Sequence, residues 1–322
     1  MAAVNTTVSA GCTDLATVTV NVFPGGFNWG IYVGQSKGFF GKYGIAVSVE
    51  ATPNSVAQMT DFAGGIFDIA MTAFDNIVAY VEGQGQAPIG PQPEFFAFMG
   101  SDTGFLSLVA SPAISDIAQL KGKRLSVDAM TTGYAFVLYD MMRRNNLNKD
   151  AGDCQLSGAG GMAQRWAALR DGSHEATLLS APYNLIAREA GFTELARAVD
   201  VIGPYQGNVA AARRSWAAAN ADKVTAYIRG YRDSIEWLYQ AGNRAEAIAI
   251  LRHSVPHLSQ SVAKATYPEL LHPTRGFCAS GEFDRAGMQC VLELRERYGL
   301  PAKKLGAMEK YCNESFLRAS RS

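Results

Sequence analysis

The stretch from residue 16 to about residue 78 alternates between strand-like and helix-like patterns, which restricts the chain to few folds. Residues 16–23, Ala-Thr-Val-Thr-Val-Asn-Val-Phe, alternate apolar and polar side chains, as a half-buried strand does. A Pro-Gly-Gly break follows, and a helix is predicted from Trp29 until glycines end it. A second strand is predicted over 46–50, and helix, strand and polar loop recur over 61–75. This order predicts an open α/β sheet, in which ligands bind at the carboxyl ends of the strands.

Four short motifs make a more specific prediction. In chain order they are Gly38-Phe-Phe-Gly-Lys-Tyr-Gly-Ile45, Gly65-Ile-Phe-Asp-Ile-Ala70, Ile117-Ala-Gln-Leu-Lys-Gly-Lys-Arg-Leu-Ser-Val127 and Trp166-Ala-Ala-Leu-Arg-Asp-Gly172. Together they resemble the solute-binding proteins of ABC importers in the nitrate, sulfonate and taurine group. The resemblance extends from about residue 17 to about residue 300, and the Leu-Lys-Gly-Lys-Arg turn is its most specific part. It implies an α/β, two-lobed type II periplasmic binding protein fold with a cleft between the lobes.

The remaining patterns fit two lobes joined by a hinge. Strands, helices and glycine breaks over 105–203 would form a second small α/β lobe, including a helix from Tyr134 to Met142 that Thr131 or Thr132 would cap. The resemblance then implies that 15–104 is the first part of lobe 1 and 105–203 is lobe 2. Residues 204–322 would return to lobe 1 and end in helices. Hinge closure on a ligand is the usual motion of such proteins.

Composition excludes some partners. The 322 residues contain 29 Lys and Arg against 29 Asp and Glu, so no broad electric field would hold nucleic acid or an anionic membrane. No apolar run is long enough to span a bilayer, and the N-terminus shows no signal peptide. The family resemblance nevertheless implies a periplasmic protein, here without its signal, that serves an ABC permease in the inner membrane; a cytosolic protein would show the same N-terminus. We expect a monomer.

The chain shows no catalytic signature, so it is not predicted to be an enzyme and no cofactor is expected. A Gly-x-Ser-x-Gly elbow, a phosphate loop and a dinucleotide fingerprint are all absent from the sequence. Five cysteines, at positions 12, 154, 278, 290 and 312, form no Cys-x-x-Cys pair, so no metal site is predicted. A disulfide bridge among Cys278, Cys290 and Cys312 and three free thiols are both compatible with the spacing.

The resemblance places the candidate ligand-binding residues in loops that face the cleft. They are Phe27, Asn28, Trp29, Thr72, Phe74 and Asp75 in lobe 1, Thr131, Thr132, Gly133, Tyr134, Arg165 and Tyr183 in lobe 2, and His272 in the C-terminal part. Aromatic side chains dominate both sets and would hold a flat or apolar ligand body. The start of the helix after Thr132 would suit a carboxylate or sulfonate, and Gly133 would let that group approach closely.

Several of these residues also have a purely structural interpretation. Trp29 and Phe27 could anchor the first helix in the core, although two large aromatic residues in a glycine-rich loop favour the cleft. Asp75 is equally compatible with a helix cap. For Arg165 a solvated helix face is the favoured interpretation. If Asp75 faced the cleft, it would indicate a ligand that carries a hydrogen-bond donor.

The predicted function is therefore capture of a small organic solute, anionic and with an aromatic or apolar body, for delivery to a membrane permease. An enzyme of thiamine-pyrimidine synthesis shares this fold by resemblance and is the alternative; the absence of a cysteine cluster and of a convincing histidine near the cleft counts against it. A cytosolic sensor module is a third possibility.

Overall fold

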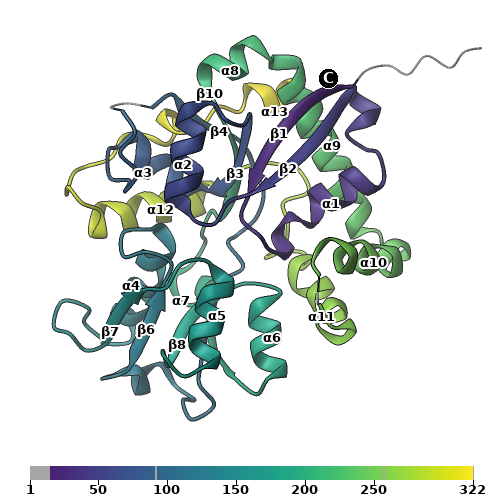
Figure 1. Ribbon diagram of the computed structural model, residues 1–322. Helices are drawn as coiled ribbons and strands as arrows, with labels where there is room; N and C mark the ends of the chain where they lie inside the picture. Colours follow the sequence, from purple (N-terminus) through teal and green to yellow (C-terminus); the bar gives the residue numbers. More distant parts are fainter. Residues whose placement is uncertain (1–14, 91–92, 257, 322) are drawn as a thin grey trace, which may run out of the picture.

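The computed structural model describes residues 15–90, 93–256 and 258–321, so Cys12 and the N-terminal segment lie outside the described residues. It is an α/β protein with two five-stranded sheets, in agreement with the predicted fold class (Figure 1). We call the part built on the first sheet lobe 1 and the part built on the second sheet lobe 2. Each lobe has its own sheet, and helices cover both.

The first sheet has the strand order β2-β1-β3-β10-β4. Its strands are β1 (Ala16–Val22), β2 (Ile45–Ala51), β3 (Ile69–Ala73), β4 (Phe95–Gly100) and β10 (Asn208–Arg213). β1, β2 and β3 are parallel, whereas β10 runs antiparallel to both of its neighbours. In β1 the apolar residues Val18, Val20 and Val22 are buried on the core side, as the alternating pattern predicts.

The second sheet has the order β7-β6-β8-β5-β9 and repeats this arrangement. Its strands are β5 (Ser107–Ala110), β6 (Arg124–Val127), β7 (Gln155–Gly158), β8 (Ala176–Leu179) and β9 (Thr193–Arg197). β6, β7 and β8 are parallel, and β5 runs antiparallel to β8 and β9. β5 and β10 are thus the strands that follow the two connections between the sheets.

Thirteen α-helices occur among the described residues. They are α1 (Trp29–Ser36), α2 (Ser55–Gly64), α3 (Phe74–Val81), α4 (Gly133–Arg144), α5 (Met162–Arg170), α6 (Tyr183–Glu189), α7 (Ala198–Ile202), α8 (Arg214–Ala219), α9 (Ala221–Tyr239), α10 (Arg244–Ser254), α11 (Gln260–Leu270), α12 (Arg285–Tyr298) and α13 (Ser315–Ala319). α1, α9, α10 and α11 pack together beside one face of the first sheet, and α3 and α12 lie beside the other (Figure 1).

One buried carboxylate joins the two connections between the lobes through hydrogen bonds. Asp102, in the first connection, accepts hydrogen bonds from the backbone N–H of Gly104 at 2.8 Å and of Asn208 at 3.0 Å. The Asn208 side chain adds a third bond at 2.9 Å. The lobe boundaries expected after residues 104 and 203 stay a prediction. Asp102 therefore fixes the crossing points side by side, which a hinge between the lobes requires.

The helix α12 packs against α3 of lobe 1 and α4 of lobe 2 (Figure 1). Arg295 of α12 forms a bidentate ion pair with Asp75 of α3, at 2.6 Å from Nε and 2.5 Å from Nη2. Its Nη2 also donates to the Thr131 carbonyl of lobe 2 at 3.1 Å, and its guanidinium lies over the Phe136 ring. The two ionic side chains are 0% and 1% exposed, so this pair forms a buried contact between the lobes.

We predict that Asp75→Asn lowers the free energy of unfolding by about 3 to 5 kcal/mol, because it leaves the Arg295 charge buried without its counter-charge. Urea unfolding followed by circular dichroism would measure the loss. Glu309→Gln is the control, since Glu309 is 71% exposed in its pair with Arg285 and an exposed pair contributes at most about 1 kcal/mol. Equal losses for the two variants would contradict a structural role of the Asp75–Arg295 pair.

Candidate ligand-binding cleft

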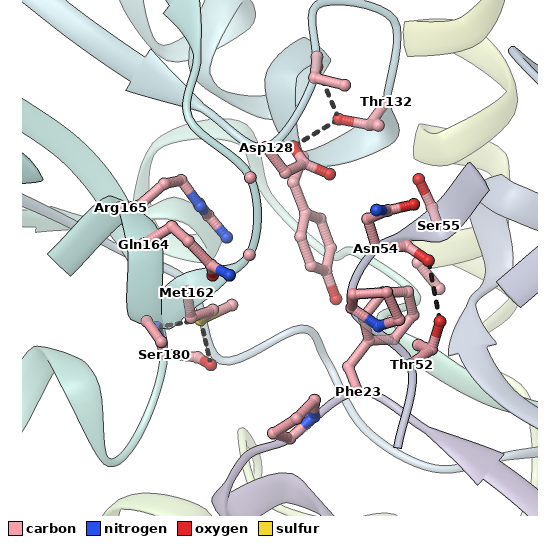
Figure 2. Close-up of a pocket in the computed structure, with 18 of the residues that line it drawn as sticks. Phe23, Thr52, Asn54, Ser55, Asp128, Thr132, Met162, Gln164, Arg165 and Ser180 are labelled. Carbon is pink, nitrogen blue, oxygen red and sulfur yellow. Dashed lines mark hydrogen bonds between the residues drawn. The ribbon is translucent and has the colours of Figure 1, made fainter. Parts of the chain in front are cut away.

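Six strand ends, three from each sheet, open into one cavity of about 460 Å³. The segments after β1, β2 and β3 form its lobe 1 side, and the segments after β6, β7 and β8 form its lobe 2 side. The carboxyl ends of parallel strands lie at the same edge of a sheet, and here the two edges face each other. Figure 2 shows the result, with Asn54 and Ser55 across the cavity from Gln164 and Arg165.

The lobe 1 side combines an apolar wall with a helix start. Phe23, Pro24 and Phe27 come from the segment between β1 and α1, and Pro53 lies in the next loop. Asn54 caps α2, since its Oδ1 accepts a hydrogen bond from the Ala57 N–H at 2.9 Å. Each of these short segments connects a strand to a helix.

The lobe 2 side begins where β6 ends, at Asp128. The Asp128 carboxylate accepts a hydrogen bond of 2.6 Å from the Thr132 hydroxyl, and Thr132 in turn caps α4 (Figure 2). The sequence predicted that Thr131 or Thr132 caps this helix, and the structure shows that Thr132 does. Tyr134, in the first turn of α4, also lines the cavity. Burial raises the pKa of the Tyr134 hydroxyl well above its usual value, so this group stays a neutral hydrogen-bonding group.

Another part of this wall is the start of α5, after β7. Its N-cap is Gly161, which offers no side chain, and the first intrahelical bond runs from the Arg165 N–H to the Gly161 carbonyl. Residues 162–164 therefore present amide N–H groups that no side chain caps, at the positive end of the helix. Met162 is held in place because its sulfur accepts hydrogen bonds from the N–H and hydroxyl of Ser180 (Figure 2).

Arg165 and Asp128 are the charged residues in the described cavity lining. The Arg165 side chain is 2% exposed, and its Nη1 donates to the Leu178 carbonyl. Burial lowers the pKa of Arg165 and raises the pKa of Asp128, while the attraction between the two opposes both shifts. The sequence favoured a solvated position for Arg165, but the structure buries it at the cavity wall.

Six of the predicted residues line this cavity: Phe27, Thr132, Gly133, Tyr134, Arg165 and Tyr183. Their contact with a ligand remains a prediction. Gly133 was expected to be glycine so that the ligand could approach closely. In the structure, a Cβ at this position would lie 2.3 Å from the Asp75 Cγ. The absent side chain makes room for the contact between the lobes rather than for the ligand.

The structure places the other lobe 1 candidates in the core. Trp29 is 0% exposed, and its Nε1–H donates to the Ala247 carbonyl at 3.0 Å, so the expectation that it faces the cleft is wrong. Asn28 is buried and donates to the Phe23 carbonyl, and Thr72 accepts a hydrogen bond from Asn76. Phe74 packs in the core against Tyr311.

Three more of the predicted residues form their contacts outside the cavity: Asp75, Thr131 and His272. Asp75 is neither a helix cap nor a cavity residue, because it is paired with Arg295; the N-cap of α3 is Ala73. The Thr131 carbonyl accepts from the same arginine. His272 contacts Thr274 and Arg275 of its own loop. Thr131 and His272 lie in loops, whereas Asp75 lies in the first turn of α3, and each of the three is engaged in contacts within the fold.

Sequence reasoning missed Asp128, Asn54, Gln164 and Ser180, which line the cavity. The available signal was their position at the end of a strand or at the start of a helix, the same signal that identified Thr132. Cys154, Cys278, Cys290 and Cys312 are free thiols, so the bridge considered for the last three is not formed. Among the described residues, no cluster of three or more His, Cys, Asp and Glu could hold a metal ion.

The chain belongs to the NMT1-like family, which matches residues 14–252. A 4-amino-5-hydroxymethyl-2-methylpyrimidine phosphate synthase of Uromyces fabae is 34% identical over 115 residues, which cover 35% of this chain and 32% of that protein. The match thus spans about a third of the length of that relative.

Solved structures with this fold cover nearly the whole chain. A protein of Bordetella bronchiseptica RB50 is 18% identical, with a TM-score of 0.79 over 95% of this chain and 97% of that one. The periplasmic nitrate-binding protein NrtA of Synechocystis PCC 6803 is 13% identical, with a TM-score of 0.74 over 95% and 88%. The alkanesulfonate-binding protein SsuA of Xanthomonas axonopodis pv. citri, bound to MOPS, is 14% identical, with a TM-score of 0.71 over 95% and 97%. At these identities the likeness shows the fold alone, and it confirms the predicted periplasmic binding protein fold.

Two neighbouring aromatic residues test the assignment of the cleft. We predict that Trp29→Ala costs about 3 to 5 kcal/mol of folding free energy, as a cavity in a core does, and leaves the affinity of the folded protein unchanged. Phe27→Ala should instead weaken ligand binding by about 1.5 to 3 kcal/mol, the value of one buried aromatic contact, at a smaller cost in stability. Calorimetry with a ligand found by screening, together with urea unfolding, separates the two effects. A large loss of affinity in Trp29→Ala alone would reverse the assignment.

Proposed function

We propose that the protein is a solute-binding protein of an ABC importer, which captures a small organic anion with an aromatic or apolar body in the cleft between its lobes. The observation that carries this proposal is the cavity itself, built from both lobes at the carboxyl ends of six strands. Its volume of about 460 Å³ suits a small molecule. NrtA is a nitrate-binding protein and SsuA is an alkanesulfonate-binding protein, which supports the same class of function.

The walls of the cavity support the proposed type of ligand. They are mostly apolar, and Phe23, Phe27 and Tyr183 supply aromatic surface from both lobes. The uncapped start of α5 and the Arg165 guanidinium supply hydrogen-bond donors and positive charge on the lobe 2 side. An anionic group would bind at this side, with its apolar body toward lobe 1.

The localisation and the partner belong to the same proposal. A protein of this function would act in the periplasm as a monomer and deliver its ligand to a permease in the inner membrane. No helix in the part of the chain that the structure describes is long and apolar enough to cross a bilayer.

An enzymatic function is the second candidate, because the Uromyces fabae relative is named as a synthase. The composition of the cavity favours binding over catalysis. Its described lining contains no His, Cys, Lys or Glu, and the remaining titratable groups are Asp128, Tyr134, Arg165 and Tyr183. Burial raises the pKa of both tyrosines, which removes them further from proton transfer near neutral pH.

A thermal-shift screen of small carboxylates, sulfonates, amines and pyrimidines tests the proposed function. We expect organic anions with an apolar body to raise the melting temperature by a few degrees, because a ligand at 100 times its Kd adds about 2.7 kcal/mol to the stability of the folded protein. Mass spectrometry after prolonged incubation should recover the ligand unchanged. Turnover of the bound compound would favour the synthase alternative, and a screen without any stabilising compound would contradict solute capture.

A further inference from the structure

Asp128 and Arg165 carry opposite charges on neighbouring elements of the cavity wall. Asp128 directly follows β6, and Arg165 lies in the first turns of α5, which follows β7. The two strands are paired in parallel, with Val127 opposite Gly158, so their carboxyl ends lie side by side. Figure 2 shows both side chains at the same side of the cavity.

These two charges do not form an ion pair with each other or with another side chain in the described part of the chain. The Asp128 carboxylate accepts the Thr132 hydroxyl, and Arg165 donates through Nη1 to the Leu178 carbonyl. The Arg165 Nε is buried and has no hydrogen-bond partner. By contrast, Asp75, Glu82 and Asp140 are buried carboxylates close to an arginine or lysine, and all three are in direct ion pairs.

Burying two opposite charges without direct contact between them is costly, because each loses hydration and the attraction between them is weaker than in an ion pair. A ligand that bears both charges would remove this cost at both ends. A plain anion would satisfy Arg165 but would place a like charge near Asp128, which opposes binding. The geometry therefore favours a ligand with an anionic group and a cationic or strongly donating group at separate positions.

We propose that the cleft selects a zwitterionic ligand, whose anionic group binds Arg165 and the amides at the start of α5, and whose ammonium or donor group binds Asp128. This inference rests on the proposed function and narrows its ligand class. The apolar body of the ligand would then extend toward Phe23, Pro24 and Phe27 of lobe 1. Asp128 acts as the specificity-determining residue, since it separates zwitterions from simple anions of the same shape.

Matched sets of three compounds test this proposal on the full chain. One set is 3-phenylpropionate, 2-phenylethylamine and phenylalanine, and a second is 3-methylbenzoate, 3-methylbenzylamine and 3-(aminomethyl)benzoate. In at least one set the zwitterion should bind about tenfold or more tightly than both of its singly charged relatives, as expected when one additional charge-assisted contact forms. Isothermal titration calorimetry measures all six affinities under the same conditions.

The Asp128→Asn variant identifies the residue responsible. Asparagine can still accept the Thr132 hydrogen bond through its Oδ1, so the start of α4 should be preserved, and the melting temperature checks this. We expect the variant to lose about tenfold or more in affinity for the zwitterion while its affinity for the anion stays equal or rises. Asp150→Asn is the matched control, because it removes the same charge from lobe 2 at an exposed side chain away from the cavity.

The outcomes distinguish this inference from the proposed function. If the anion binds as tightly as the zwitterion, or if Asp128→Asn affects both ligands equally, the zwitterion inference is wrong and solute capture stands. If none of the six compounds and none of the screened solutes binds, both are wrong. A preserved preference for the zwitterion in Asp128→Asn would assign the selection to another residue and overturn the role given to Asp128.

Discussion

The buried ion pair between Asp75 and Arg295 determines how the two lobes face each other. Arg295 binds lobe 1 through the Asp75 carboxylate and lobe 2 through the Thr131 carbonyl. The residues directly after Thr131 form a wall of the cavity, so the position of this wall relative to lobe 1 depends on the same arginine. Gly133 completes the arrangement, because a larger residue would collide with Asp75 and separate the lobes.

The cavity obtains its polar groups from the way each helix begins. α2 and α4 start with Asn54 and Thr132, whose side chains cap the helix and at the same time line the cavity. α5 starts with Gly161 and leaves its first amides uncapped. Capping is a local property of the chain, whereas the meeting of three helix starts depends on the parallel strands that precede them. Side chains therefore cap the starts of α2 and α4, whereas the first amides of α5 have no side-chain cap and could bind a ligand.

Sequence patterns predicted strands whose side chains alternate between apolar and polar, and helices with glycine next to one end. β1 and α4 lie close to their predicted ranges, 16–23 and 134–142. β4 and α11 were not predicted: β4 is apolar throughout because both of its faces are buried, and α11 contains Pro268, which normally argues against a helix. Trp29 was misplaced because sequence shows an aromatic residue in a glycine-rich loop but not which side chains surround it. Its partner, the Ala247 carbonyl, is more than 200 residues away in the chain.

The contrast between Asp75 and Asp128 shows why the sequence could not identify the charged part of the site. Both aspartates follow a strand, β3 or β6, and both precede or begin a helix. Asp75 is neutralised by Arg295, which comes from a helix 220 residues further along the chain. Asp128 has an arginine nearby but no ion pair with it. The sequence analysis linked a cleft-facing Asp75 to a ligand with a hydrogen-bond donor. In the structure the aspartate that lines the cavity is Asp128, so the same argument concerns Asp128. Tertiary contacts therefore decide which of the two aspartates is held in an ion pair within the fold.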